Sequence, residues 1–259
     1  MFMKKIVDLS KWQNKVNYNE LGKECSLAIL RVQDGSVVKD SMYGIHAKGC
    51  ESMCIPYGVY AFARFTSTED AKVEAKDFYA RANVYGKPLF YVIDVEMKTM
   101  GNMRAGAEAY LQQLRLLGAE KIGIYIAHHE YEDFNIKTSS ADFIWLPRYH
   151  QNGRDLIAPK YKCDLHQYTD RGKIAGITGS VDLNRLTGTK SLQWFLGEDQ
   201  SYRVTANHLN IREQPSMSGK IVGTLSKSGK VIVLSVDENG WAETKYKSKK
   251  AYVFRSYLD

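Results

Sequence analysis

The chain has 259 residues, of which 44% are hydrophobic and 25% charged, and these ordinary values exclude a disordered, collagen-like or coiled-coil chain. No apolar run approaches the roughly 18 residues of a membrane-spanning helix, which excludes an integral membrane function. The net charge of +7 comes mainly from residue 200 onward, which favours an anionic partner there: nucleic acid, membrane headgroups or a wall polymer.

The first 196 residues contain short apolar runs separated by helical or loop segments. Eight runs are strand candidates: residues 4–8, 27–33, 57–64, 89–96, 121–127, 142–148, 163–168 and 181–183. Two intervening segments are predicted helices, residues 67–82 after the N-terminal cap Ser67 and residues 102–117 before Gly118. This alternation predicts an irregular (β/α) barrel of about eight strands or a doubly wound sheet, and the lack of a glycine-rich phosphate loop disfavours the sheet.

From residue 201 onward, apolar and polar residues alternate between turn signals. Asn239-Gly240 between the runs 231–236 and 241–245 predicts a β-hairpin. The sequence therefore predicts a small all-β module after the barrel. We expect a first domain over residues 1–196, a short linker over 197–202 and a second domain over 203–259, docked or only modestly mobile.

The cysteines predict packing rather than chemistry. They are Cys25, Cys50, Cys54 and Cys163. No CxxC pair or metal-ligand spacing occurs among them, and four are too few for a disulfide framework in a chain of this length. We expect reduced thiols.

Carboxylates lie at the predicted strand ends. Asp8 ends the first strand, and Asp94 and Glu96 end the fourth. Asp182 lies in the last strand. The carboxyl ends of the strands of a parallel barrel open on one face, so these four acids should converge there. Asp94 and Glu96 are two positions apart on a strand, so they point to the same side, about 6.5–7 Å apart along the chain. Two carboxyls held this close repel, so one stays protonated while its neighbour is ionised. Glycoside hydrolysis requires such a pair.

Sugar-binding side chains occupy comparable positions. The candidates are Tyr60, Phe62, Tyr125, Trp145, Tyr149 and Gln167. Core packing is an equally good interpretation of the aromatic residues. His128-His129-Glu130 lacks the spacing of a metal site, and we expect neither a metal nor an organic cofactor.

Four short motifs follow one another along the first domain: residues 7–12 (VDLSKW), 58–62 (GVYAF), 93–96 (IDVE) and 180–184 (SVDLN). Together they resemble glycoside hydrolase family 25, the Chalaropsis-type lysozymes that include many bacteriophage endolysins. The resemblance covers about residues 3–195. It implies an irregular barrel and N-acetylmuramidase activity on the β-1,4 bond from N-acetylmuramic acid to N-acetylglucosamine, with Glu96 as general acid. It also implies that Asp94, Asp8 and Asp182 surround Glu96.

The route of hydrolysis stays open from the sequence. A covalent intermediate needs carboxyls about 5–5.5 Å apart, inversion needs about 6.5–9.5 Å, and substrate-assisted enzymes use the acetamido group of the sugar. The Asp-x-Glu spacing permits the assisted route, with Asp94 steadying the acetamido group, and this is our leading hypothesis.

The C-terminal segment resembles a bacterial SH3-type domain. The residues that carry this resemblance are 209–212 (LNIR), Pro215, 221–225 (IVGTL), 239–241 (NGW) and 251–253 (AYV). Ala251 stands where the pattern usually has Gly. The resemblance implies binding to wall peptide or crossbridge, and Trp241 and Tyr252 are the candidate binding residues, with core packing as the alternative.

We therefore expect a peptidoglycan hydrolase with neither a nucleic-acid partner nor membrane insertion. Because Ile6 and Val7 run directly into Asp8, no signal peptide is predicted. The protein should collect in the bacterial cytoplasm and reach the wall through a phage holin or lysis, and a prophage or autolysin origin is the alternative. Rival functions are a hydrolase of chitin-like sugars, a non-catalytic wall lectin and a nucleic-acid binder with steeply salt-dependent affinity.

Overall fold

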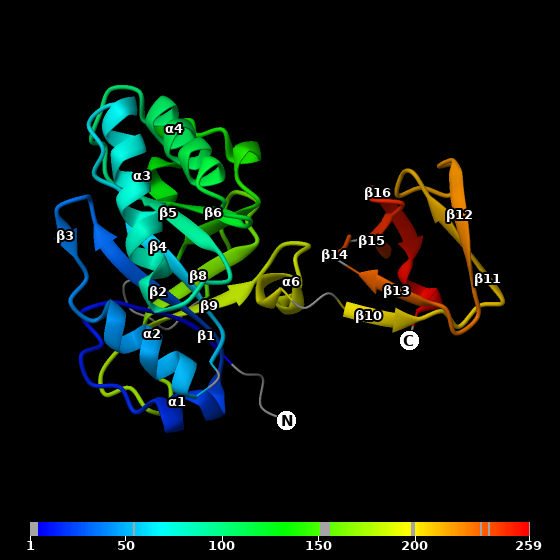
Figure 1. Cartoon of the computed structure of the whole chain (residues 1–259), viewed down its shortest axis with the longest axis horizontal. Helices are drawn as coiled ribbons and strands as arrows, with labels where there is room; N and C mark the ends of the chain where they lie inside the picture. Colours follow the sequence, from blue (N-terminus) through cyan, green and yellow to red (C-terminus); the bar gives the residue numbers. More distant parts are fainter. Residues whose placement is uncertain are drawn as a thin grey trace. The chain divides into compact units, whose positions relative to one another are not determined.

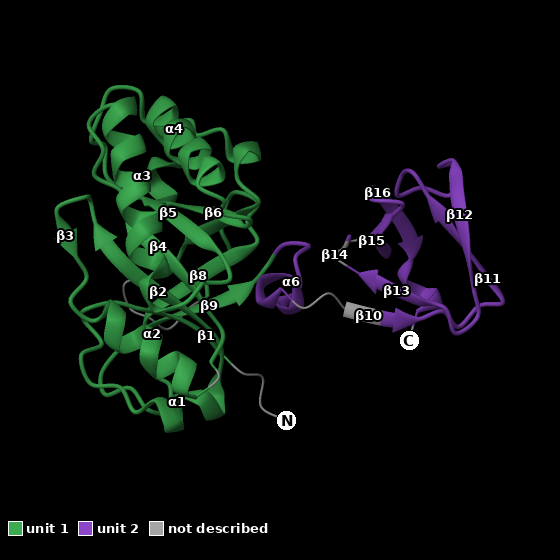
Figure 2. Ribbon diagram, viewed as in Figure 1, with its two compact units in different colours: residues 1–187 green, residues 188–259 purple. Residues whose placement is uncertain are grey.

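The computed structural model describes residues 5–53, 55–150, 156–197, 200–233, 235–237 and 239–258. The chain divides into two compact units, residues 1–187 and 188–259 (Figure 2). This division falls nine residues before the domain end expected from the sequence. Cys50 and Cys163 are free thiols, Cys25 is buried, and Cys54 lies outside the described residues.

The first unit is a barrel (Figure 1). Its strands are β1 (Lys5–Leu9), β2 (Cys25–Asp34), β3 (Val38–Lys39), β4 (Tyr57–Phe62), β5 (Tyr91–Val95), β6 (Ile122–Ile126), β7 (Phe143–Pro147), β8 (Leu165–Gly172) and β9 (Val181–Leu186). They pair in the order β1-β9-β8-β7-β6-β5-β4-β2, and β1 also pairs with β2, so eight of the described strands close on themselves. The predicted barrel is confirmed.

Helices cover the outside of the barrel. They are α1 (Tyr18–Glu24), α2 (Tyr43–Ser52), α3 (Thr68–Ala82), α4 (Met103–Leu116) and α5 (Tyr131–Phe134), with 3₁₀ turns η1 (Asn83–Tyr85), η2 (His128–Glu130) and η3 (Thr138–Ser140). Both predicted helices are present, and α3 and α4 lie side by side (Figure 1). The Ser67 side chain accepts a hydrogen bond from the Asp70 backbone and begins α3, as its sequence predicts.

The second half of the barrel departs from a regular (β/α) repeat. Between β7 and β9 the described residues form no helix, as expected from the short polar connections. The last strand corrects the expectation of an all-parallel barrel, because β9 runs antiparallel to both β8 and β1. Asp182 lies near the start of β9, and the reversed direction brings it to the end of the barrel where the other strands finish.

Aromatic rings close the opposite end of the barrel interior. Phe90 and Phe143 are fully buried and meet edge to face, with ring centroids 5.3 Å apart. Gly58 and Gly123 leave room for them, since a Cβ on either glycine would lie 2.2 Å from the neighbouring ring. Outside the barrel, alternate strand residues pack against the helices in the main hydrophobic core.

The second unit contains a short helix, small strands and a separate core. Its elements are α6 (Leu192–Leu196), β10 (Gln200–Arg203), β11 (His208–Arg212), β12 (Ile221–Ser226), β13 (Lys230–Val233), β14 (Ser235–Val236), β15 (Trp241–Tyr246), β16 (Lys249–Phe254) and η4 (Arg255–Tyr257). The predicted hairpin is present: β14 pairs antiparallel with β15, and Gly240 adopts a positive φ of 82° in the turn. In the described part of the chain, no helix is long and apolar enough to span a membrane.

Candidate active site

The four predicted carboxylates converge at one end of the barrel interior. They line a cavity of about 150 Å³ together with five of the six predicted sugar-binding residues. The lining residues are Asp8, Tyr60, Asp94, Glu96, Tyr125, Trp145, Tyr149, Gln167 and Asp182. Strands far apart in the sequence therefore bring together nearly all of the predicted site.

Asp8 is held by amide donors. Gln167 donates to both of its carboxylate oxygens at 3.1 and 3.3 Å, and Asn184 donates to Oδ2 at 2.8 Å. Behind these amides, Tyr125 donates to Gln167 Oε1 and the Trp145 indole donates to Asn184 Oδ1. Burial raises the pKa of Asp8, and the amide donors oppose that rise by stabilising the ionised form.

Asp182 is directly opposite Asp8 in the β1–β9 pairing. Burial and the neighbouring charge of Asp8 raise the pKa of Asp182 to about 9. Two carboxyls held this close cannot both ionise cheaply, so Asp182 keeps a proton that it shares with Asp8 near neutral pH.

Asp94 and Glu96 form a second carboxyl pair at the end of β5. Asp94 is 4% exposed, and among the described residues its Oδ1 has no hydrogen-bond partner. Burial raises the pKa of Asp94 well above its ordinary value, and the charge of Glu96 adds to the rise. Burial also raises the pKa of Glu96. The pair therefore holds a proton at a pH where exposed carboxyls have lost theirs.

The aromatic residues divide into three groups. Trp145 is buried, and its ring meets the rings of Tyr125 and Tyr60 edge to face at 4.8 and 6.1 Å. Tyr149 is half-buried at the cavity edge. Phe62 is not among the residues that line the cavity, and the Arg64 guanidinium lies over its ring, 4.4 Å from the centroid.

Sequence reasoning missed Asn184 and Arg31 as site residues. Asn184 lies in the 180–184 motif, but its role depends on the β8–β9–β1 pairing, which no local pattern reveals. Arg31 interrupts an apolar strand, which was an available signal. Its Nε lies 2.7 Å from Asp40, whose side chain is fully buried, and its charge opposes the rise in the pKa of Asp94.

Comparison with known proteins places both units of the chain in families. Residues 7–177 match the profile of the family described as Glycosyl hydrolases family 25. The chain is a member of this family. Residues 207–259 match the bacterial SH3 domain, so the C-terminal resemblance is confirmed as well.

Two solved structures and one curated relative resemble this family 25 hydrolase. A glycosyl hydrolase 25 virulence factor of Streptococcus pneumoniae is 34% identical, with TM-score 0.69, over 74% of this chain and 90% of the other. The catalytic domain of endolysin ply40 from Listeria monocytogenes bacteriophage P40 is 27% identical, with TM-score 0.67, over 72% and 94%. The autolytic lysozyme of Clostridium acetobutylicum is 23% identical over 79% of this chain and 64% of its own length.

A larger groove adjoins the acid cavity of the hydrolase. It measures about 410 Å³ and shares Glu96, Tyr125 and Tyr149 with the cavity. Its other lining residues are Ala127, His128, His129, Pro147, Arg148 and Ile157. Within the described residues, no group of three or more His, Cys, Asp or Glu side chains is arranged to hold a metal ion.

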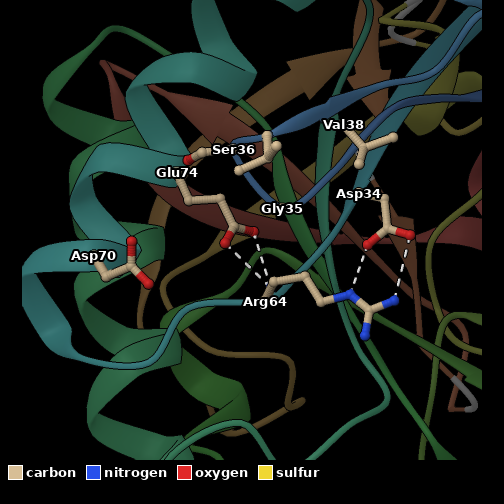
Figure 3. A pocket seen from close by; sticks show the side chains of 8 residues that line it. Asp34, Gly35, Ser36, Val38, Arg64, Asp70 and Glu74 are labelled. Carbon is tan, nitrogen blue, oxygen red and sulfur yellow. Dashed lines mark hydrogen bonds and ion pairs between the residues drawn. The ribbon is translucent and has the colours of Figure 1, made fainter.

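Another cavity, of about 420 Å³, lies between the β2–β3 turn and the start of α3 (Figure 3). Its polar groups engage one another: Arg64 binds Asp34 through two nitrogens at 2.6 and 3.3 Å. Glu74, 2% exposed, accepts a hydrogen bond from the Arg64 backbone. These contacts hold the loop after β4 in place. The cavity itself is separate from the carboxyl cluster.

Proposed function

We propose that this family 25 hydrolase is a lysozyme that cleaves the β-1,4 bond between N-acetylmuramic acid and N-acetylglucosamine in bacterial peptidoglycan. The observation that carries the proposal is the buried Asp94–Glu96 pair with raised pKa values at the open end of the barrel. A carboxylic acid that stays protonated can donate to a glycosidic oxygen, which exposed carboxylates cannot do near neutral pH.

In this proposal Glu96 is the general acid: it takes the proton of the pair from Asp94 as the substrate binds, which leaves Asp94 ionised. It lines both the acid cavity and the adjoining groove. As the C1–O bond of N-acetylmuramic acid breaks, Glu96 protonates the departing O4 of N-acetylglucosamine. The positive charge that develops at C1 is stabilised by the carboxylate of Asp8, which the two amides keep oriented.

Asp94 acts on the acetamido group of the substrate. The acetamido oxygen attacks C1 and forms a cyclic oxazolinium, while Asp94 binds the acetamido N–H. Water then adds to C1, and Glu96, now ionised, takes the proton from that water. Tyr60 and Tyr149 line the same cavity and can contact the sugar ring, and Asp182 keeps Asp8 in place through the shared proton.

The C-terminal unit is proposed to bind wall peptide or crossbridge. Tyr252 is the better candidate, because it is half-buried with the Lys250 ammonium 5.6 Å from its ring. Trp241 is 6% exposed and packs against Phe254, which favours a core role. We further propose that the protein reaches the wall after holin-type release or lysis.

The decisive experiment compares the intact protein with Glu96→Gln on purified peptidoglycan. New reducing ends are counted and the fragments are identified by mass spectrometry. We expect N-acetylmuramic acid ends from the wild type and at least a 100-fold lower rate from Glu96→Gln, because general acid catalysis is worth about 10²–10⁴ in rate. Glu69→Gln, on the exposed start of α3, is the matched control and should cleave at the wild-type rate.

Two results would contradict the proposal. Reducing N-acetylglucosamine ends would indicate a glucosaminidase. A Glu96→Gln protein that cleaves like the Glu69→Gln control would remove Glu96 from the acid role. Trapping of a glycosyl adduct on Asp94 would leave the acid in place but replace the assisted route with a covalent one.

A further inference from the structure

The groove beside the acid cavity must hold part of any glycan that reaches Glu96. The acid cavity measures about 150 Å³, less than the roughly 300–1,000 Å³ of typical small-molecule sites. The adjoining groove of about 410 Å³ continues from the same Glu96, Tyr125 and Tyr149. A charged side chain in this groove would therefore meet whatever the substrate carries next to the bond that breaks.

Arg148 is the fixed cation of this groove. Its backbone N–H donates to Gln167 O at 2.9 Å, and its backbone carbonyl accepts from His166 Nε2 at 2.7 Å. His166 is in turn held by Arg185, whose Nε donates to its other ring nitrogen at 3.0 Å. The residue is thus attached to β8, the same strand whose Gln167 side chain orients Asp8.

The guanidinium of Arg148 is oriented by a neutral histidine. Arg148 Nη1 lies 3.0 Å from Nε2 and 3.1 Å from Nδ1 of His128, so it contacts both nitrogens of the imidazole ring. The ring is itself held by the backbone N–H of Lys160, which donates to Nε2 at 3.0 Å. Burial and the charge of Arg148 lower the pKa of His128, so its ring stays uncharged at neutral pH. His128 therefore orients the guanidinium without neutralising or repelling it.

Two cations near the groove have carboxylate partners, whereas Arg148 has none among the residues that the structure describes. Lys160 forms an ion pair with Glu132 at 2.9 Å, and Arg64, near Glu96, is paired with Asp34. Across residues 5–53, 55–150, 156–197 and the described C-terminal segments, no carboxylate forms an ion pair with Arg148. A half-buried guanidinium that pairs with no described carboxylate is suited to bind a carboxylate of a ligand with two hydrogen bonds.

We propose that Arg148, oriented by His128, binds a carboxylate that the glycan carries beside the scissile bond and so makes the enzyme selective for acidic over neutral amino-sugar polymers. This inference rests on the proposed muramidase function and adds the basis of its substrate choice. N-acetylmuramic acid carries a lactyl ether that ends in a carboxyl group. That group is either free or amide-linked to a peptide with carboxylates of its own, and both sources present the same chemistry to Arg148.

The test measures how strongly each protein prefers acidic strands. Four full-length proteins are compared: wild type, Arg148→Gln, Arg148→Lys and the control Arg104→Gln, whose arginine lies on α4. The substrates are peptidoglycan strands with intact peptides, strands freed of peptide by an amidase, and strands whose carboxyls have been converted to methylamides. The readout is kcat/KM on the carboxylate strands divided by kcat/KM on the methylamide strands.

We expect wild type and Arg104→Gln to prefer carboxylate strands at least tenfold, and Arg148→Gln to bring this ratio close to one. Arg148→Lys should restore part of the preference, because it returns the charge without the planar fork of arginine. A preference that persists on amidase-treated strands identifies the lactyl carboxylate, and one confined to intact strands identifies the peptide. The inference is overturned if the wild type shows no preference or if Arg148→Gln keeps it.

Binding separates this inference from the proposed activity. The same strands are titrated onto Glu96→Gln and onto Glu96→Gln combined with Arg148→Gln. If the wild type cleaves no strand but Glu96→Gln binds carboxylate strands more tightly in an Arg148-dependent manner, the proposed activity fails and the carboxylate site stands. If the wild type cleaves while Arg148 affects neither binding nor preference, the carboxylate site fails and the activity stands.

Discussion

The two ends of the barrel interior are built on opposite principles. At one end Phe90 and Phe143 meet edge to face beside Gly58 and Gly123. At the other end four carboxyls share a small cavity, and burial raises the pKa of each of them. Close packing stabilises the first end, whereas the second carries like charges whose burial costs stability.

This difference separates stability from function along the barrel axis. Buried acids with raised pKa values are unfavourable for folding, so their presence needs a chemical reason, and glycoside hydrolysis supplies one. Close packing at the aromatic end stabilises the barrel and offsets the free-energy cost of burying the acids. Substitutions at the two ends should therefore have opposite consequences for stability and activity.

The largest expected effect comes from Asp94→Asn. This isosteric change removes one of two repelling carboxyls, so the unfolding temperature should rise while cleavage of peptidoglycan falls at least 100-fold, the usual loss when one transition-state stabiliser is removed. Calorimetry and the reducing-end assay measure the two quantities on the same preparation.

The control for Asp94→Asn is the same substitution at a well-paired acid. Asp40 accepts from Arg31 at 2.7 Å and from two backbone N–H groups, so Asp40→Asn should lower stability by roughly 3 kcal/mol or more. If Asp94→Asn and Asp40→Asn both lower the unfolding temperature, repulsion between the buried carboxyls does not destabilise the fold. The proposed difference between the two ends of the barrel would then be wrong.

The second prediction concerns the aromatic end. Gly123→Ala places a methyl group 2.2 Å from the Phe143 ring, which is fully buried and cannot move freely. Overpacking of this kind costs roughly 3 kcal/mol, so the unfolding midpoint in guanidinium chloride should fall clearly. Gly101→Ala is the matched control, because a methyl group at that position would have no neighbouring atom within 4 Å. Equal midpoints for the two variants would show that the glycine is not needed for packing.

The sequence predicted which acids lie at the carboxyl end of the barrel better than it predicted the strand directions and contacts that bring them there. Asp8, Asp94 and Glu96 follow apolar strands, a local pattern that places them at one end of any parallel barrel. Asp182 reaches the same end only because β9 runs antiparallel, which the sequence pattern did not reveal. Phe62 shares the strand periodicity of Tyr60 but lies under Arg64, a long-range contact that periodicity does not encode.

Residues that act through others were hardest to predict. Asn184 orients Asp8 across a pairing between the first and last strands of the barrel, and Arg148 depends on a histidine twenty positions away. Hydrophobic patterns report which face of a strand is buried, not which polar groups meet on that face. The network behind the acids therefore required the closed barrel.

Glu74 tests whether a buried acid with a raised pKa always marks the site. It lies outside the carboxyl cluster on α3, and burial raises its pKa to about 7 (Figure 3). In the unfolded chain its pKa is near 4.5, so the unfolded state releases the proton first and stability falls as the pH rises from about 4.5 to 7. Glu74→Gln cannot titrate, and it should be more stable than the wild type by roughly 3 kcal/mol at pH 8.

The difference in stability between Glu74→Gln and wild type should change with pH. Below pH 4.5 both side chains are neutral, so calorimetric scans of Glu74→Gln and wild type should converge there and separate through pH 7. The acids of the cavity titrate equally in both proteins and cancel from the difference. Glu69→Gln, whose side chain is 79% exposed on the same helix, should give a difference that is flat with pH. If the stability difference between Glu74→Gln and wild type did not change with pH, the Glu74 carboxyl would ionise freely in the folded protein. Peptidoglycan cleavage by Glu74→Gln should be nearly unchanged, because Glu74 holds the loop after β4 and takes no part in the reaction.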